Sequence, residues 1–130
     1  MRWIHDANCF LSRYQVDPAR RDEFIGAVNE LLAFAGPWYD EGCNFAFQGW
    51  SRDPNQWVAI ASWKTEDILN KLRQTPEFRD ITTRMLSCCT GDMTMEEFAG
   101  MKNGRAVFDQ YPPGRSDIYL PSGSLGVKFL

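Results

Sequence analysis

The sequence predicts an α+β domain with the element order β-α-β-β-α-β, and three observations support this prediction. Two apolar, aromatic runs at residues 43–51 and 56–63 flank a Pro- and Asn-containing turn at residues 52–55, which is the pattern of a β-hairpin. A helical apolar stripe precedes the hairpin, and two helix starts follow it, at Thr65 and at Thr75. This order is that of the split βαβ, ferredoxin-like fold with an antiparallel sheet.

The first helix is predicted to begin at Asp17-Pro18, with Asp17 as the N-cap and Pro18 in the first turn. We expect it to end near residue 35, because Gly36-Pro37 combines a favoured C-terminal cap with a residue that cannot continue a helix. Residues 38–42 are then predicted as a loop. The residues at the spacing of one buried helix face are Phe24, Ala27, Val28, Leu31, Leu32 and Ala35.

One further strand is predicted before the first helix, and another after the last helix. The first covers residues 8–16, and its weak alternation of apolar and polar positions is typical of a strand covered on both faces. The last lies within residues 88–98. Residues 1–98 therefore form one domain, and residues 99–130 form a C-terminal extension rich in Gly and Pro. We expect the extension to lie against its own domain or a partner subunit, with short β-like pieces at residues 105–108 and 118–120.

Composition excludes several classes of function. The chain has 130 residues and a net charge of −3 with no basic block, so we expect no nucleic-acid partner. No apolar run approaches the roughly 20 residues of a membrane helix, and the N-terminus does not resemble a signal peptide, so we expect a cytoplasmic protein without membrane contact. The four cysteines form no CxxC pair, and the one histidine is His5. We therefore expect no metal site, and buried free thiols rather than a Cys88–Cys89 disulfide.

Four segments resemble the antibiotic biosynthesis monooxygenase (ABM) family of the dimeric α+β barrel superfamily. They are Val16-Asp17-Pro18 with Asp22-Glu23-Phe24, Gly42-Cys43-Asn44-Phe45, Arg52-Asp53-Pro54-Asn55, and Ala61-Ser62-Trp63-Lys64-Thr65-Glu66-Asp67 followed by Thr75-Pro76-Glu77-Phe78. The resemblance covers about residues 10–98. It implies a homodimer in which two sheets meet face to face, with a pocket between each sheet and its own helices. The activities it implies are cofactor-independent oxidation of hydroxylated polycyclic aromatics to quinones, and haem degradation.

The chain departs from both branches of that family. The haem-degrading branch has an Asn where this chain has Ser12 and a His ligand where it has Leu72, although its Trp is matched by Trp63. The quinone-forming branch has an Asn where this chain has Ala59. Haem degradation is therefore not expected, and the specific quinone-forming mechanism is also in doubt.

The candidate site lies along the second strand of the hairpin. Trp57, Ala59, Ala61 and Trp63 share one face, and two indoles flanking two alanines suit a flat aromatic ligand. The alternative is that a helix packs closely over the alanines and the indoles belong to the core. The apolar helix residues predicted to contact the substrate are Phe24, Leu72 and Met85.

Few polar groups are available on this wall. Ser12 and Tyr14 of the first strand share the face assigned to the pocket, where they could contact a substrate oxygen; the alternative for Tyr14 is a bond to a backbone carbonyl. Asn44, Gln48 and Trp50 share a face of the other hairpin strand. Parity alone leaves open whether that face lines the pocket or the barrel interior.

The expected function is that of a small monooxygenase that oxidises a hydroxylated aromatic or polyketide-like molecule without a cofactor. The ionised substrate would react with dioxygen, while Trp63 and Trp57 hold the ring and Tyr14 or Ser12 contacts the oxygen. Two alternatives remain open: a non-catalytic small-molecule-binding or accessory protein, and a lyase or isomerase of the same barrel fold.

Overall fold

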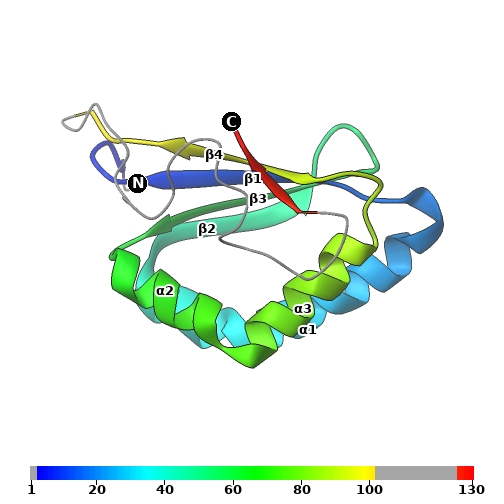
Figure 1. The fold of residues 1–130 in the computed structure, drawn as a ribbon. Coiled ribbons are helices and arrows are strands. Elements are labelled where there is room, and N and C mark those ends of the chain that lie inside the picture. The colour runs from blue at the N-terminus through cyan, green and yellow to red at the C-terminus, as the bar shows by residue number, and fades with distance from the viewer. Residues whose placement is uncertain (1–2, 102–125) are drawn as a thin grey trace.

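The computed structural model describes residues 3–101 and 126–130, which form one sheet with a layer of helices on one face (Figure 1). The sheet has the strand order β2-β3-β1-β4-β5. The elements in chain order are β1 Cys9–Gln15, the 3-10 turn η1 Pro18–Arg20, α1 Arg21–Gly42, β2 Cys43–Trp50, β3 Gln56–Trp63, α2 Glu66–Gln74, α3 Pro76–Ser87, β4 Met93–Phe98 and β5 Val127–Phe129.

The predicted ferredoxin-like α+β fold is confirmed, and the C-terminal strand extends it. β1 lies between β3 and β4 and pairs antiparallel with both, and β2 and β3 form the predicted antiparallel hairpin. β5 was not predicted; it pairs parallel with β4, so the sheet is mixed. The end of the extension thus joins the sheet of its own domain. The strand pieces predicted at residues 105–108 and 118–120 lie outside the described residues.

The helix starts predicted at Thr65 and Thr75 are confirmed by capping bonds, which each threonine accepts from the residue three positions further on. The start predicted at Asp17-Pro18 is that of the 3-10 turn η1, where Asp17 accepts a hydrogen bond from the backbone N–H of Ala19. The α-helix α1 begins only at Arg21, and its N-cap, Arg20, makes no side-chain capping bond. Capping bonds satisfy backbone donors that the first helical turn leaves without intrahelical partners. The order of the helices is therefore encoded locally, by residues that can be read from the sequence.

The predicted end of α1 is wrong, because the helix continues through Pro37 to Gly42. A proline in a helix removes one backbone hydrogen bond and crowds the preceding turn. Tertiary contacts offset this cost: the Tyr39 ring lies 5.2 Å from the Trp63 ring, and Gly42 is buried against it. Leu32, predicted on the buried stripe, is 45% exposed, since the neighbouring Leu31 takes the position that faces the sheet.

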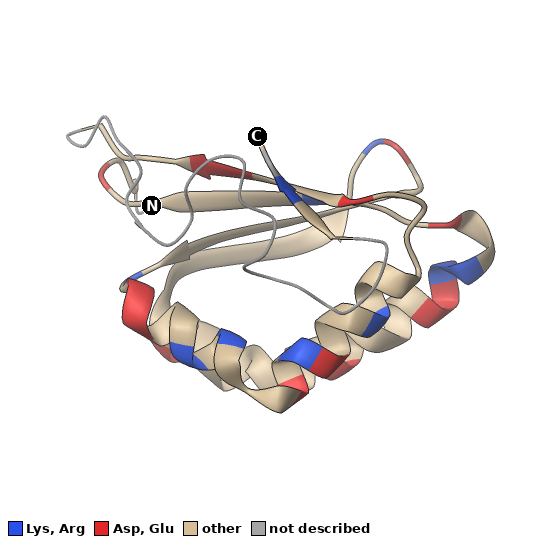
Figure 2. Cartoon of the chain, viewed as in Figure 1, with Lys and Arg blue, Asp and Glu red and all other residues tan. Residues whose placement is uncertain are grey.

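The two faces of the sheet have different surroundings. The inner face carries Phe10, Ser12 and Tyr14 of β1, which are buried beneath the helices. No helix among the described residues covers the outer face. Phe47 is 56% exposed there, and Arg13 of β1 forms an ion pair with Glu96 of β4. Figure 2 shows that charged residues concentrate on the helix layer, whereas most of the sheet is uncharged.

Candidate functional site

The inner face of the sheet carries a patch of small side chains. Strand pairing places Ser12 of β1 beside Ala59 of β3, and Ala59 beside Gln48 of β2. We refer to these three residues as the Ser12–Ala59–Gln48 row. The next row along the strands also has alanines at its centre, Ala61 and Ala46. Because these side chains are short, the helices above them cannot fill all the space over the sheet.

An apolar, partly enclosed cavity of about 80 Å³ lies over these rows. An engineered protein cavity of about 150 Å³ binds benzene, so this one is small and even a one-ring ligand would require its walls to move. Ser12, Tyr14, Ala59, Ala61 and Trp63 all line it, as expected for the pocket face. The helices and β4 supply the remaining walls, through Leu31, Tyr39, Leu69, Phe78, Thr82, Leu86, Met93 and Met95.

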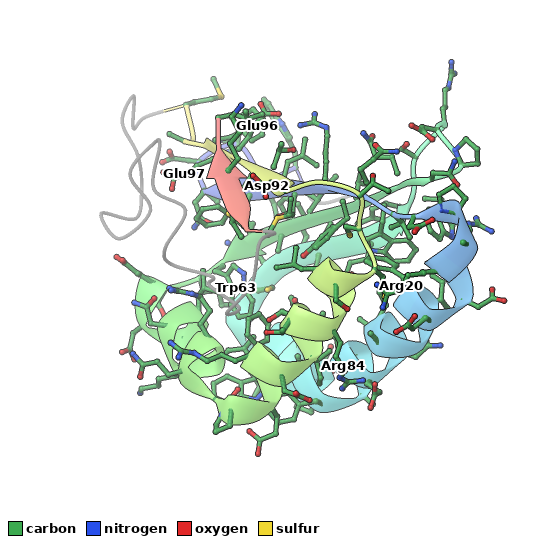
Figure 3. The ribbon with its side chains drawn as sticks, turned by 45° about the vertical axis from the view of Figure 1, so that its right-hand side comes forward. Arg20, Trp63, Arg84, Asp92, Glu96 and Glu97 are labelled. Carbon is green, nitrogen blue, oxygen red and sulfur yellow. The ribbon has the colours of Figure 1, made fainter. Side chains whose placement is uncertain are left out.

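Trp63 lines the cavity, on the side of the sheet that the helices cover (Figure 3). Its indole is 3% exposed, and the ring of Tyr39 lies 5.2 Å from it. The buried side chain of Asn8 bonds both backbone groups of Trp63: Nδ2 donates to the carbonyl oxygen at 2.6 Å, and Oδ1 accepts from the N–H at 3.2 Å. Gly42 leaves the room that the indole needs, because a Cβ there would lie 3.0 Å from it.

Side chains of the protein itself fill the other end of the predicted slot. The ring of Trp57 lies 5.1 Å from Trp50 and 5.8 Å from Phe24, and Phe24 also contacts Tyr14 at 5.7 Å. The guanidinium of Arg21 lies 4.1 Å above Trp50. Trp57 and Phe24 therefore belong to the core and are not part of the cavity lining, since α1 brings Phe24 down onto the indoles.

Two further predicted contact residues also lie away from the cavity. Leu72 of α2 and Met85 of α3 are 0% and 1% exposed and are absent from the lining. Their helices instead present Leu69, Phe78 and Leu86 to the cavity. These are neighbours on the same apolar faces, so the sequence identified the correct helices.

The polar groups on the lining are neutral. Besides the indole N–H of Trp63, they are Ser12, Tyr14, Tyr39, Gln48 and Thr82, and the Thr82 hydroxyl donates to the Phe78 carbonyl at 2.8 Å. Among the described residues, the lining contains no Asp, Glu, His, Lys or Arg. The site can therefore orient a ligand by hydrogen bonding and exclude water, but its only titratable groups are the two phenols.

The thiols lie outside this lining. All four cysteines are free, and Cys88 and Cys89 are buried. Burial raises the pKa of Cys43 and of Cys89 to about 12, so both remain protonated at neutral pH. Within residues 3–101 and 126–130, no three His, Cys, Asp or Glu side chains lie together as a group that could hold a metal ion.

Three contributors to the site were missed by the sequence reasoning. Tyr39 falls in the loop predicted at residues 38–42, and Asn8 falls at the start of the first predicted strand. Parity leaves open which face Gln48 occupies, and the structure shows a bulge between Cys43 and Phe45 that shifts the register of β2. The bulge separates Asn44, which bonds Ser62, from Gln48, which faces the cavity. Gln48 lies two residues before Trp50 and so shares its face of the strand. This spacing is the one sequence signal that could have suggested the position of Gln48.

Solved structures share this fold at low sequence identity. An antibiotic biosynthesis monooxygenase aligns with a TM-score of 0.65 and 16% identity, over 72% of this chain and 98% of its own. A variant of SnoaB, a cofactor-independent oxygenase from Streptomyces nogalater, gives 0.60 and 24%, over 76% and 97%. A dimeric ferredoxin-like protein of unknown function from Jannaschia sp. CCS1 gives 0.59 and 12%, over 70% and 96%. The chain thus shares the fold of these proteins.

The other comparisons found no relative. No protein-family model matches the chain, and no curated protein does. In the part of the chain that the structure describes, no helix combines the length and apolar character needed to cross a membrane.

Proposed function

We propose that the protein is a cofactor-independent monooxygenase that oxidises a small hydroxylated aromatic or polyketide-like molecule. The observation that supports this most is the apolar cavity that is lined by the Trp63 indole and has hydroxyl and amide groups on its floor. With its walls moved apart, such a cavity can hold an aromatic ring, bind its oxygen and keep bulk water away. The shared fold with SnoaB, itself a cofactor-independent oxygenase, is consistent with this chemistry.

In the proposed reaction, the ionised substrate is the reductant and dioxygen is the oxidant. The substrate anion transfers one electron to O₂, and the two radicals combine at a ring carbon to give a peroxide. The peroxide loses water as the carbon becomes a carbonyl. A phenol would become a quinone by losing two hydrogens and gaining one oxygen, and the second oxygen atom leaves as water. No external reductant is needed.

The protein's part in this reaction is to bind and orient. Trp63 lies against the ring, and the Tyr14 and Ser12 hydroxyls contact the substrate oxygen. We assign substrate contact also to Ala59 and Ala61, which form the floor. Because the described lining contains no carboxylate, imidazole or amine, the substrate must ionise through its own acidity, aided by neutral hydrogen-bond donors.

We further propose that the active form is a homodimer joined through the outer face of the sheet. Phe45, Phe47 and Phe98 are 38%, 56% and 44% exposed on that face. Large apolar side chains gathered on one face are typical of an interface. The Jannaschia protein, described as dimeric and ferredoxin-like, has a similar fold.

Oxygen uptake tests the proposed function. Chelator-treated protein is mixed with one-ring and polycyclic hydroxylated aromatics, and an oxygen electrode records consumption above the protein-free rate. With ¹⁸O₂, one labelled atom should enter each product molecule. The Trp63→Ala and Trp63→Phe variants should lose activity at least tenfold, whereas Trp3→Phe, at a position 73% exposed, should not. Full activity in a folded Trp63→Ala protein would contradict the role of Trp63.

The second candidate is a small-molecule-binding or accessory protein. The absence of a carboxylate, imidazole or amine from the described lining favours it, because binding needs no proton transfer. Saturable ligand binding without oxygen uptake or product would identify this function. Product formed without oxygen uptake would instead indicate a lyase or isomerase.

A further inference from the structure

The orientation of the Gln48 side chain is fixed by its neighbour on the next strand. The indole Nε1 of Trp57 donates a hydrogen bond to Gln48 Oε1 at 3.1 Å. An indole N–H can only donate, so the amide must turn its oxygen toward Trp57. The usual ambiguity between the oxygen and the nitrogen of a glutamine is thereby resolved.

The other end of this amide, Nε2, is consequently available to a ligand. Gln48 is half-buried and lines the cavity, whereas Trp57 does not. The structure records no hydrogen bond from Gln48 Nε2 to any of the described residues. A donor with two N–H groups therefore faces an apolar cavity, held by an indole that is 8% exposed.

We propose that Gln48 is the donor that binds the ionised oxygen of the ligand, and that the site thereby selects phenols and enols over aromatics without an acidic hydroxyl. This inference rests on the proposed function, because it concerns the substrate of the same cavity. Beyond the proposed function, it names Gln48 as the group that distinguishes the ionised ligand from the neutral ligand.

The row to which Gln48 belongs gives the position of that oxygen. Ser12 and Gln48 pair with the same residue, Ala59, from opposite sides. Their Cα atoms are two strand spacings apart, about 10 Å. An oxygen above the Ala59 methyl group therefore lies between the Ser12 hydroxyl and the Gln48 amide. The ring then extends over Ala61 toward Trp63, so the acidic hydroxyl is at the end of the ligand far from Trp63.

A neutral donor is effective here because of its surroundings. The lining has no cation among the described residues, so no ion pair competes for the anionic oxygen. A hydrogen bond to a charged group is stronger in an apolar site than in water. Since Trp57 already holds the amide, little reorganisation is needed when charge develops on the oxygen.

The pKa of a bound phenol measures this interaction without requiring catalysis. We would titrate 4-nitrophenol, whose phenolate absorbs visible light, with the full-length protein under anaerobic conditions across a pH range. Gln48→Glu is the sharpest variant, because its carboxylate can still accept the Trp57 N–H bond but cannot donate to the ligand. Gln48→Leu removes both bonds, and Gln74→Glu makes the same charge change at an exposed site on α2.

We expect the bound phenol to ionise at lower pH in the wild-type protein than in either Gln48 variant. The difference should be about one pKa unit or more, equal to a tenfold loss of preference for the phenolate. Gln74→Glu should behave as wild type. Trp57→Phe, which keeps a ring but removes the N–H, should lose part of the preference, because the amide is then free to turn.

The outcomes separate this inference from the proposed function. A bound pKa that is the same in wild type, Gln48→Glu and Gln48→Leu overturns the role of Gln48 and leaves the monooxygenase proposal standing. The expected shift without oxygen uptake by any phenol supports Gln48 and overturns the monooxygenase proposal. Failure of the wild-type protein to bind 4-nitrophenol or smaller phenols overturns both.

Discussion

Removal of the Asn8 side chain should destabilise the protein far more than its short length suggests. Asn8 is 5% exposed and makes two hydrogen bonds to the backbone of Trp63, which is 55 residues away in the sequence. In Asn8→Ala, the N–H and carbonyl of Trp63 lose their partners while still buried. Each unsatisfied buried group costs about 1–3 kcal/mol, so we expect a loss of about 2–6 kcal/mol in the free energy of unfolding.

Urea and thermal denaturation, followed by circular dichroism, measure this loss. At about 3 °C per kcal/mol for a domain of this size, the melting temperature should fall by roughly 6–18 °C. Asn29→Ala, at an exposed position of α1, is the matched control and should change stability by less than about 0.5 kcal/mol. A loss in Asn8→Ala no larger than in this control would refute the reasoning.

A second variant separately tests the hydrogen bond that Asn8 Nδ2 donates to the Trp63 carbonyl. Asn8→Asp keeps the acceptor for the Trp63 N–H but turns a carboxylate oxygen toward the Trp63 carbonyl. The folded state therefore favours the protonated acid, and its pKa should be raised. Stability should be lowest at neutral pH and recover as the pH falls and the acid becomes a donor. No recovery at acidic pH, relative to wild type, would contradict this geometry.

Three further predictions concern the packing around Trp63, the burial of Cys89 and the ionisation of the substrate. In Gly42→Ala the new Cβ would lie 2.7 Å from Ile68 Cγ2, so we expect the free energy of unfolding to fall by about 1–3 kcal/mol. Ligand quenching of Trp fluorescence should also be weaker. Unchanged stability and quenching would contradict the close approach. Burial raises the pKa of Cys89 to about 12, so a disulfide reagent should leave that thiol unlabelled in native protein at pH 8, and prompt labelling would refute this burial. The stability that the buried, protonated Cys89 thiol contributes is complete below the unfolded thiol pKa of about 8.5 and is lost as the pH rises toward 12. Finally, the pH at which oxidation reaches half its maximum should follow the acidity of each substrate, and a midpoint common to all substrates would indicate a protein base instead.

Local signals in the sequence were sufficient to predict most of the fold. The capping threonines Thr65 and Thr75 mark their helices through bonds to residues three positions away, which need no tertiary information. Pro37 is a local signal too, but here it misled. The helix passes through it because Tyr39 and Gly42 pack against Trp63, a contact that the local sequence does not encode.

The candidate site was predictable only in part, for the same reason. Strand alternation correctly placed Ser12, Tyr14, Ala59 and Trp63 on one face, since that periodicity is a property of any strand. The extent of the cavity depends on how α1 sits on the sheet, which determines that Phe24 fills the space beside Trp57. The side of Gln48 depends on a bulge that has no clear sequence signal.

Filling the cavity over Ala59 tests whether ligands bind there. We would compare ligand binding by wild type, Ala59→Leu and the control Ala33→Leu at an exposed position of α1, using anaerobic fluorescence titration with a one-ring phenol. We expect saturable binding by wild type and Ala33→Leu, and at least tenfold weaker binding by a folded Ala59→Leu protein. Equal binding by all three proteins would contradict binding in this cavity.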